Sequence, residues 1–224
     1  MGILYVIGTP IGNLKDISLR SLEALKEVDL ILCEDTRETK KLLEKYEIKK
    51  PLLSYHQHSK LSRIEEIAQY LREGKNLALV SDAGTPGISD PGNLLIEKLV
   101  EIDPEQKIFP IPGPSALTSA ASVSGFPVDR FLFLGFPPQK KKRKKFFEDL
   151  AQVKYSVILY ESPWRIIKTL ENLRETVGNR KVVVCRELTK KFETTYRGGI
   201  KEVAEKIKKD GGKGEFVIIL NCEK

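Results

Sequence analysis

The sequence has few cysteines and no long apolar run. Its cysteines, Cys33, Cys185 and Cys222, each lie in a short apolar stretch, have no CxxC spacing and make an odd number. Disulfide frameworks use paired cysteines in secreted chains, so we expect a reducing, cytoplasmic location. No stretch approaches the roughly 18 apolar residues of a membrane helix, so no membrane association is expected. Residues 1–8 lack the features of an export signal and are predicted to form a core strand.

Signatures of several common enzyme classes are also missing. The sequence contains neither GxGxxG nor GxxxxGK[ST], which argues against NAD enzymes and ATPases. It has no HExxH, no Cys/His cluster with metal-ligand spacing and no GxSxG, so no metal site or serine nucleophile is expected. His56 and His58 could bind a metal or a substrate, but a polar pair without a third ligand is more often solvated.

Positive charge is plentiful. The 224 residues include 38 Lys and Arg against 31 Asp and Glu, a formal net charge of +7. An anionic partner is therefore expected, and nucleic acid is the leading candidate. Six cations follow one another without an acid between them: Lys140, Lys141, Lys142, Arg143, Lys144 and Lys145. Because charges of both signs usually alternate on a solvated face, this basic run favours contact with RNA phosphates.

Short apolar runs alternate with helical patterns in the first half of the chain. Strands are predicted at residues 3–7, 30–32, 77–80 and 107–111. A helix is predicted between Ser59 as its cap and Gly74 as its stop. This alternation is typical of parallel βαβ units, so the fold class is α/β.

Residues 109–115 contain three prolines and a glycine and cannot continue a helix or a central strand. We place a domain boundary there, with an N-terminal parallel α/β sheet domain over residues 1–112 and a C-terminal mixed α+β sheet domain over residues 113–224. The second domain is predicted to contain strands at 131–134, 156–160, 181–185 and 216–220, and helices at 163–177 and 200–209.

Three Gly/Pro-rich turns follow predicted strands, at residues 8–14, 81–92 and 111–116. In open α/β sheets ligands bind beyond the carboxyl ends of the strands, where glycine lets the backbone approach the ligand. One such loop is explained equally well as a tight turn. The 81–92 loop, with three glycines and two prolines, is too elaborate for that explanation, so we predict that the three turns converge on one pocket.

Charged residues also follow several predicted strands. Glu34, Asp35 and Arg37 follow the second strand, where Asp35 could simply cap the next helix. Asp82, Glu161 and residues 186–193 occupy similar positions. Carboxylates there can bind a polar substrate or accept a proton as general base, and their burial would be costly unless they are paired.

Taken in order, these segments resemble the tetrapyrrole methylase superfamily, and within it the branch that methylates small-subunit ribosomal RNA. The matching segments are TPIGNL at 9–14, EDTR at 34–37, SYH at 54–56, the 81–92 loop, PGPSA at 112–116, FLGF at 133–136, YESP at 160–163, RELTK at 186–190 and KGE at 213–215. They run along essentially the whole chain, and the ordered set is far more specific than any one of them.

The resemblance implies a two-domain fold with S-adenosylmethionine bound in the cleft between the domains, usually in a homodimer. It implies methylation of a cytidine ribose 2′-oxygen near the decoding centre of 16S ribosomal RNA, within the assembled small subunit. The cofactor contacts carried over are Pro10, Gly84, Thr85, Ile88, Ser115, Ala116 and Tyr160. Arg37, Arg186 and Lys190 would face the RNA together with the basic run.

Methyl transfer to oxygen needs accurate positioning and a group that takes the hydroxyl proton. The candidates for that base are Asp35, Glu34 and Glu187, with Arg37 and Lys190 orienting the phosphodiester; no metal is needed. Two other interpretations stay open. The chain could methylate a tetrapyrrole or another small molecule, or it could be an RNA-binding protein that keeps the fold without catalysis.

Overall fold

The computed structural model describes residues 1–56, 59 and 61–221, so His58 and Cys222 lie outside the described residues. The chain divides into two compact units, Met1–Ser115 and Ala116–Lys224, whose boundary falls three residues beyond the expected one at residue 112. No helix in the described part of the chain is both long and apolar enough to cross a bilayer.

The first unit is built on a sheet of five parallel strands. These are β1 (Leu4–Ile7), β2 (Leu30–Cys33), β3 (Leu52–Ser54), β4 (Leu77–Val80) and β5 (Ile108–Ile111), in the order β3-β2-β4-β1-β5. The predicted parallel α/β architecture is confirmed. Because all strands point the same way, every loop that leaves a strand's carboxyl end emerges at the same edge of the sheet.

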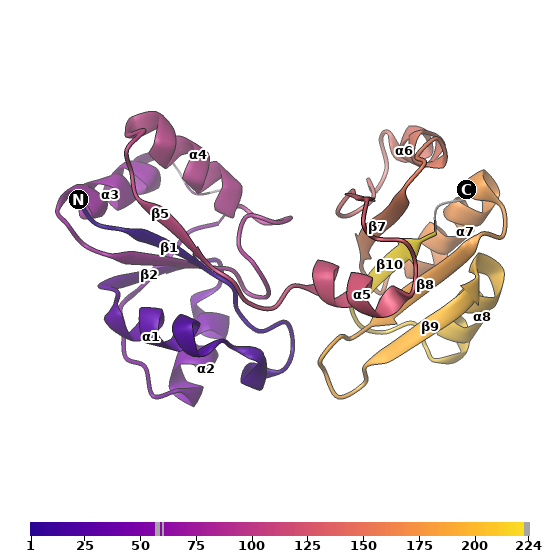
Figure 1. The fold of residues 1–224 in the computed structure, drawn as a ribbon, viewed down its shortest axis with the longest axis horizontal. Coiled ribbons are helices and arrows are strands. Elements are labelled where there is room, and N and C mark those ends of the chain that lie inside the picture. Colours follow the sequence, from indigo (N-terminus) through magenta and orange to yellow (C-terminus); the bar gives the residue numbers. More distant parts are fainter. Residues whose placement is uncertain (57–58, 60, 222–224) are drawn as a thin grey trace. The chain divides into compact units, whose positions relative to one another are not determined.

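Helices cover both faces of this sheet (Figure 1). They are α1 (Leu19–Glu27), α2 (Thr36–Lys45), α3 (Leu61–Arg72) and α4 (Gly92–Ile102), with a short 3-10 helix, η1 (Leu14–Asp16), before α1. Successive residues of β4 point to opposite faces. Ala78 and Val80 therefore pack with α1 and α2, whereas Leu77 and Leu79 pack with α3 and α4.

The strand order makes the edge beyond β1 and β4 a natural ligand site. β1 continues into α1 on one face of the sheet, and its neighbour β4 continues into α4 on the other face. The two loops therefore diverge at a topological switch point, which is where open parallel sheets bind ligands.

The second unit has a mixed sheet, as predicted. Its strands are β6 (Phe131–Phe133), β7 (Ser156–Glu161), β8 (Lys181–Arg186), β9 (Thr194–Gly199) and β10 (Phe216–Leu220), in the order β6-β7-β10-β8-β9. β6 and β7 are parallel and the other pairs are antiparallel. β9 was not predicted, because this edge strand has no aliphatic run and consists of two threonines, a tyrosine, an arginine and two glycines.

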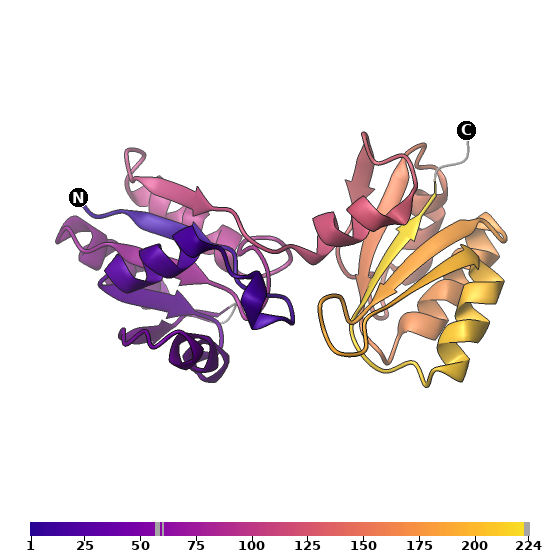
Figure 2. The same cartoon turned by 60° about the horizontal axis from the view of Figure 1, so that its bottom comes forward.

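Four helices belong to the second unit: α5 (Ala116–Ser124), α6 (Arg143–Ala151), α7 (Ile166–Val177) and α8 (Ile200–Lys209). Leu159, Val184 and Ile218 form one core with α6, α7 and α8. Figure 2 shows α5 on the opposite face of the sheet from α7 and α8. The predicted α8 is confirmed to the residue, while α7 begins three residues later than expected because residues 162–165 form a turn.

Within the described residues, each unit holds one buried free cysteine, Cys33 in β2 and Cys185 in β8. Burial raises the pKa of both thiols above the ordinary value of 9.0. Since the thiolate is the reactive form, both cysteines are core residues of low nucleophilic reactivity.

A buried polar network organises the second unit around Glu161, whose side chain is fully buried. Glu161 accepts hydrogen bonds from the Thr169 hydroxyl at 2.6 Å and the Ser162 N–H at 2.8 Å, and pairs with Arg165 at 2.8 Å. Arg143 in turn donates to the Thr169 hydroxyl at 2.8 Å. The hydroxyl thus relays between a buried carboxylate and a buried guanidinium, and each group is satisfied.

The same network fixes the loop before α6. Arg143 donates to the carbonyl of Pro138, and Arg165 donates to the carbonyl of Pro137, both at 2.9 Å. Arg143 is therefore a buried structural residue, and its expected contact with RNA phosphates does not fit its position. The other five residues of the basic run remain exposed.

We predict that Thr169→Val lowers the free energy of unfolding by about 1–3 kcal/mol, because it leaves two buried charged groups short of a hydrogen-bond partner. The measurement is urea denaturation followed by circular dichroism. Thr176→Val on the same helix is the matched control, since Thr176 donates only to the Asn172 carbonyl. Equal losses in the two variants would refute the relay.

Candidate functional site

The loops after β1 and β5 come together through two glycines with no side chain between them. A Cβ on Gly8 would lie 2.7 Å from the Gly113 Cα, and a Cβ on Gly113 would lie 2.6 Å from the Gly8 carbonyl oxygen. Real Cβ atoms do not approach backbone this closely. Glycine is therefore required at both positions for the two chain segments to leave the sheet side by side.

The loop after β4 is bound to both of these segments. Thr9 and Gly84 exchange backbone hydrogen bonds of 2.9 and 3.1 Å, and the Thr9 hydroxyl donates to the Ser81 carbonyl. Thr85 donates its hydroxyl proton to the Pro114 carbonyl at 3.4 Å. The three Gly/Pro turns therefore come together, at the switch point, while the expectation that they form one pocket stays a prediction.

Asp90 shapes the far end of the β4 loop. Its carboxylate accepts the backbone N–H groups of Gly87 at 2.7 Å and Gly92 at 2.9 Å. Between them, Ile88 holds a side chain that is 47% exposed. Two hydrogen bonds thus hold the backbone of this loop, which presents an apolar side chain to solvent. Of the other expected cofactor contacts, Pro10 in the first turn is buried.

In the second unit, Tyr160 lies beside the start of α5. Its phenol oxygen accepts the backbone N–H of Leu117 at 3.1 Å, next to Ala116. The rings of Phe133 and Phe136 contact the Tyr160 ring edge-on, with centroids 4.9 and 5.6 Å away. Two of the expected cofactor contacts, Ala116 and Tyr160, therefore belong to one ordered aromatic corner.

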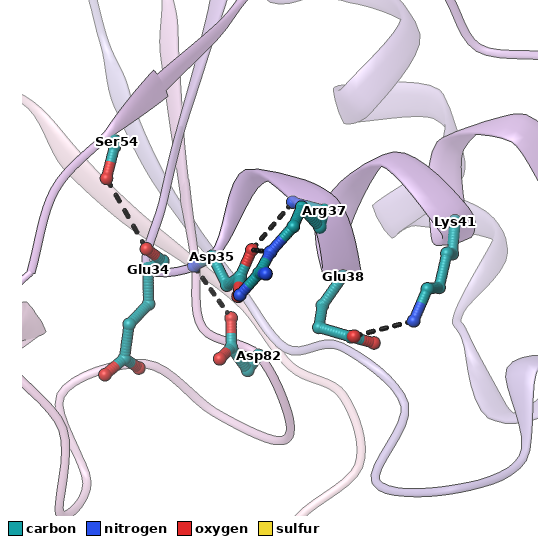
Figure 3. Close-up of polar contacts among 7 residues, drawn as sticks. All are labelled: Glu34, Asp35, Arg37, Glu38, Lys41, Ser54 and Asp82. Atoms are coloured by element: carbon teal, nitrogen blue, oxygen red, sulfur yellow. Dashed lines mark hydrogen bonds and ion pairs between the residues drawn. The ribbon is translucent and has the colours of Figure 1, made fainter.

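An acidic cluster follows β2 (Figure 3). Asp35 caps α2 by accepting the Arg37 N–H at 2.8 Å, and the Arg37 guanidinium bonds both carboxylate oxygens, the nearer at 2.6 Å. Asp82 from the β4 loop accepts the Asp35 N–H at 3.0 Å. The Glu34 carboxylate points away from the Asp35–Arg37 pair, and none of the other side chains drawn there donates a hydrogen bond to it.

These surroundings shift the pKa values of the carboxylates in opposite directions. Hydrogen bonds from Arg37 lower the pKa of Asp35 from 3.8 to about 2. Burial, followed by the charges of Asp82 and Asp90, raises the pKa of Glu34 above 4.5. Burial likewise raises the pKa of Asp82 above 3.8. Glu34 is therefore the better proton acceptor of the adjacent candidates, since Asp35 is held as a carboxylate by its arginine.

The third candidate base, Glu187, is also paired. Its Oε1 accepts the Lys190 ammonium at 3.0 Å and the Glu215 N–H at 2.9 Å. Burial opposes ionisation, but these bonds and the positive charges nearby outweigh it and lower the pKa of Glu187. The pKa of Lys190 is raised, since its bonds to Glu215 and Glu187 outweigh the opposing effect of burial.

The backbone around Glu187 is strained. Glu187 and Thr189 adopt left-handed φ values of 52° and 65°, which non-glycine residues rarely do. A side chain on Gly214 would meet the Glu187 side chain at 2.5 Å. Strain of this kind is concentrated at functional sites. The Arg186 side chain is anchored beside it by a 2.6 Å bond to the Lys213 carbonyl.

Some features of the site could not be read from the sequence. Asp90 and the Gly8–Gly113 contact were missed because single acidic residues and glycines give no signal until the loops are placed together.

Among the described residues no group of three or more His, Cys, Asp or Glu side chains could hold a metal.

The chain shares its fold with enzymes of known structure. A cobalt precorrin-4 methyltransferase of cobalamin biosynthesis aligns with a TM-score of 0.69 at 20% identity, covering 98% of this chain and 94% of that one. A diphthine synthase aligns with a TM-score of 0.72 at 18% identity, covering 98% of this chain and 90% of that one. These likenesses establish the shared architecture.

The sequence gives the family. The family model of the Tetrapyrrole (Corrin/Porphyrin) Methylases matches residues 3–204, and the chain belongs to this family. It is therefore a methyltransferase, and with the family comes its methyl donor, S-adenosylmethionine. The resemblance noted in the sequence motifs is confirmed.

Close relatives cover both units. The protein named Ribosomal RNA small subunit methyltransferase I in Thermotoga maritima is 47% identical over 221 residues, 99% of each chain. The protein of the same name in Bacillus subtilis is 46% identical over 221 residues, which are 98% of this chain and 75% of that one.

We predict that Asp35→Asn lowers the thermal midpoint at pH 7, because asparagine keeps the helix cap but loses the pairing with Arg37. A depressed pKa stabilises the fold above the ordinary pKa of 3.8, and this contribution is lost as pH falls toward about 2. The difference from wild type should therefore shrink below pH 4 in differential scanning calorimetry. Asp149→Asn, at an exposed position on α6, is the control; a difference independent of pH would contradict the assignment.

Proposed function

We propose that this chain transfers a methyl group from S-adenosylmethionine to the ribose 2′-oxygen of a cytidine in 16S ribosomal RNA, near the decoding centre. The substrate is the assembled small subunit, and the enzyme acts in the cytoplasm as a homodimer. The observation that carries the proposal is the 42–47% identity, over almost the whole chain, to relatives named Ribosomal RNA small subunit methyltransferase I.

The glycine-lined edge of the first unit suits the cofactor. Gly8 and Gly113 let the loops after β1 and β5 pack backbone against backbone, which keeps these loops together at the edge where parallel sheets bind ligands. Its contacts in this unit are assigned to Pro10, Gly84, Thr85, Ile88 and Ser115. In the second unit they are assigned to Ala116 and Tyr160. When bound, the sulfonium supplies an electrophilic methyl group with an excellent leaving group.

The chain's own task is then to position the ribose and remove its proton. Glu34 is the proposed general base, since its carboxylate points away from Arg37, which pairs with Asp35, and burial raises its pKa. Glu34 would take the proton of the ribose 2′-hydroxyl, so that the oxygen could accept the methyl group that the cofactor supplies. Asp35 and Glu187 instead hold Arg37 and Lys190, so their role is to orient cations toward the RNA.

RNA binding is assigned to cations in both units, which are exposed at α2 and in the basic run and half-buried at the end of β8. Arg37 projects from the start of α2 with 84% of its side chain exposed. The basic run contributes Lys140, Lys141, Lys142, Lys144 and Lys145, and the β8 end contributes Arg186 and Lys190. Contacts of this kind make binding fall steeply with salt.

The decisive experiment is transfer of labelled methyl from S-adenosylmethionine to small ribosomal subunits lacking their native methylation. The modified nucleotide is then mapped. Label on one cytidine 2′-oxygen is the expected result. Label on another position would correct the nucleotide, and no label on subunits or naked RNA would withdraw the RNA substrate while leaving the family membership intact.

We predict that Glu34→Gln lowers kcat about 100-fold or more, with binding of S-adenosylmethionine in calorimetry unchanged. In wild type, kcat/KM should fall as pH drops through the Glu34 pKa, because the protonated acid cannot act as a base. This limb should be absent in the variant. Glu38→Gln, which alters the exposed Glu38–Lys41 pair one turn away, is the matched control and should keep full activity. Near-normal turnover of Glu34→Gln would remove Glu34 from the mechanism.

A further inference from the structure

Trp164 is the only tryptophan of the chain and is 92% exposed. A tryptophan left in water contributes no buried area to the fold, although it is the largest apolar side chain available. It is more exposed than any other large hydrophobic residue of the described chain. Its ring is therefore available to a partner.

The turn that carries Trp164 is held rigidly. Ser162 accepts the backbone N–H groups of Arg165 and Ile166 through its carbonyl, both at 3.1 Å. The Arg165 guanidinium is fixed by the buried Glu161 at 2.8 Å and by the Pro137 carbonyl at 2.9 Å. Trp164 lies within this fixed turn, so little backbone freedom is lost when its ring binds a partner.

The surroundings of the turn are cationic and aromatic. Through Arg165, the turn is tied to the loop that leads directly into the basic run. Phe136, adjoining Pro137, is half exposed while its ring rests against Tyr160. Lys168, one turn further along α7, is also exposed. Aromatic rings beside a row of cations are the combination by which proteins hold single-stranded nucleic acid.

We propose that Trp164 is a stacking platform for an unpaired base of the substrate RNA, next to the phosphate-binding basic run. The proposal rests on the RNA substrate proposed above and adds to it a residue and a mode of contact. Unpaired bases are favoured over a protein partner because the turn is tied through Arg165 to the loop that leads into the basic run, and Lys168 beside it is exposed. Phosphates adjoining a stacked base would pair with the lysines, whereas a protein interface core is depleted of charge.

Because Trp164 is the sole tryptophan, its fluorescence reports the contact directly. Short single-stranded RNA titrated into the full-length protein should quench the emission, since a stacked base lies against the indole ring. An equal titration with double-stranded RNA, whose bases are already stacked on one another, should quench much less.

Three variants separate stacking from electrostatics. Trp164→Ala should weaken RNA binding about 5- to 100-fold while leaving its salt dependence unchanged. Lys141→Ala with Lys144→Ala should instead reduce the salt slope. Tyr155→Ala is the matched control, because Tyr155 is also an exposed aromatic but lies at the opposite end of β7. Trp164→Phe should retain most of the binding, and circular dichroism checks that each variant is folded.

The outcomes distinguish this proposal from the proposed function. Specific methylation of small subunits by wild type, without quenching by single-stranded RNA or with full binding by Trp164→Ala, overturns the stacking role alone. A defect of Trp164→Ala on assembled subunits but not on naked RNA assigns Trp164 to a protein contact and also overturns it. If wild type neither binds nor methylates RNA, both proposals fall.

Discussion

The contact between the Gly8 and Gly113 backbones is the constraint on which the first unit's site depends. Two neighbouring parallel strands leave the sheet there with no side chain between them, and the β4 loop is then bound to both through Thr9 and Thr85. Rigid loops at a switch point present backbone groups that need no reorganisation when a ligand arrives. The parallel sheet and its two helical layers keep this edge in place.

Neighbouring cations make the pKa values of the acidic residues differ. Arg37 and Lys190 keep Asp35 and Glu187 ionised, so these carboxylates act as fixed negative charges. Glu34, one residue before Asp35, lies at the end of the buried β2 strand and experiences burial rather than pairing. Adjacent carboxylates in one segment thus differ in pKa because one side chain turns toward an arginine and the other turns away from it.

The architecture could be predicted further from the sequence than the site could. Continuous apolar runs located β4 and β10 to the residue, because both strands are buried on both faces, and one-sided apolar periodicity located α8. Convergence of the glycine turns followed from the rule for parallel sheets. The burial of Arg143 could not be predicted, because its partners Thr169 and Asn172 belong to another helix, α7. Nothing in a run of six consecutive cations marks the one that faces the interior. The pairing that separates Glu34 from Asp35 likewise depends on side-chain direction.

The two buried thiols give each unit an internal reporter of its own integrity. Cys33 lies in the central part of one sheet and Cys185 in the other, and neither can meet a thiol reagent until the strand around it opens. With Cys222 replaced by serine, the rate at which each remaining cysteine is alkylated would measure local opening of its own sheet. Comparison of the two rates would show which of the two sheets opens more often, with the protein's own cysteines as the reporters.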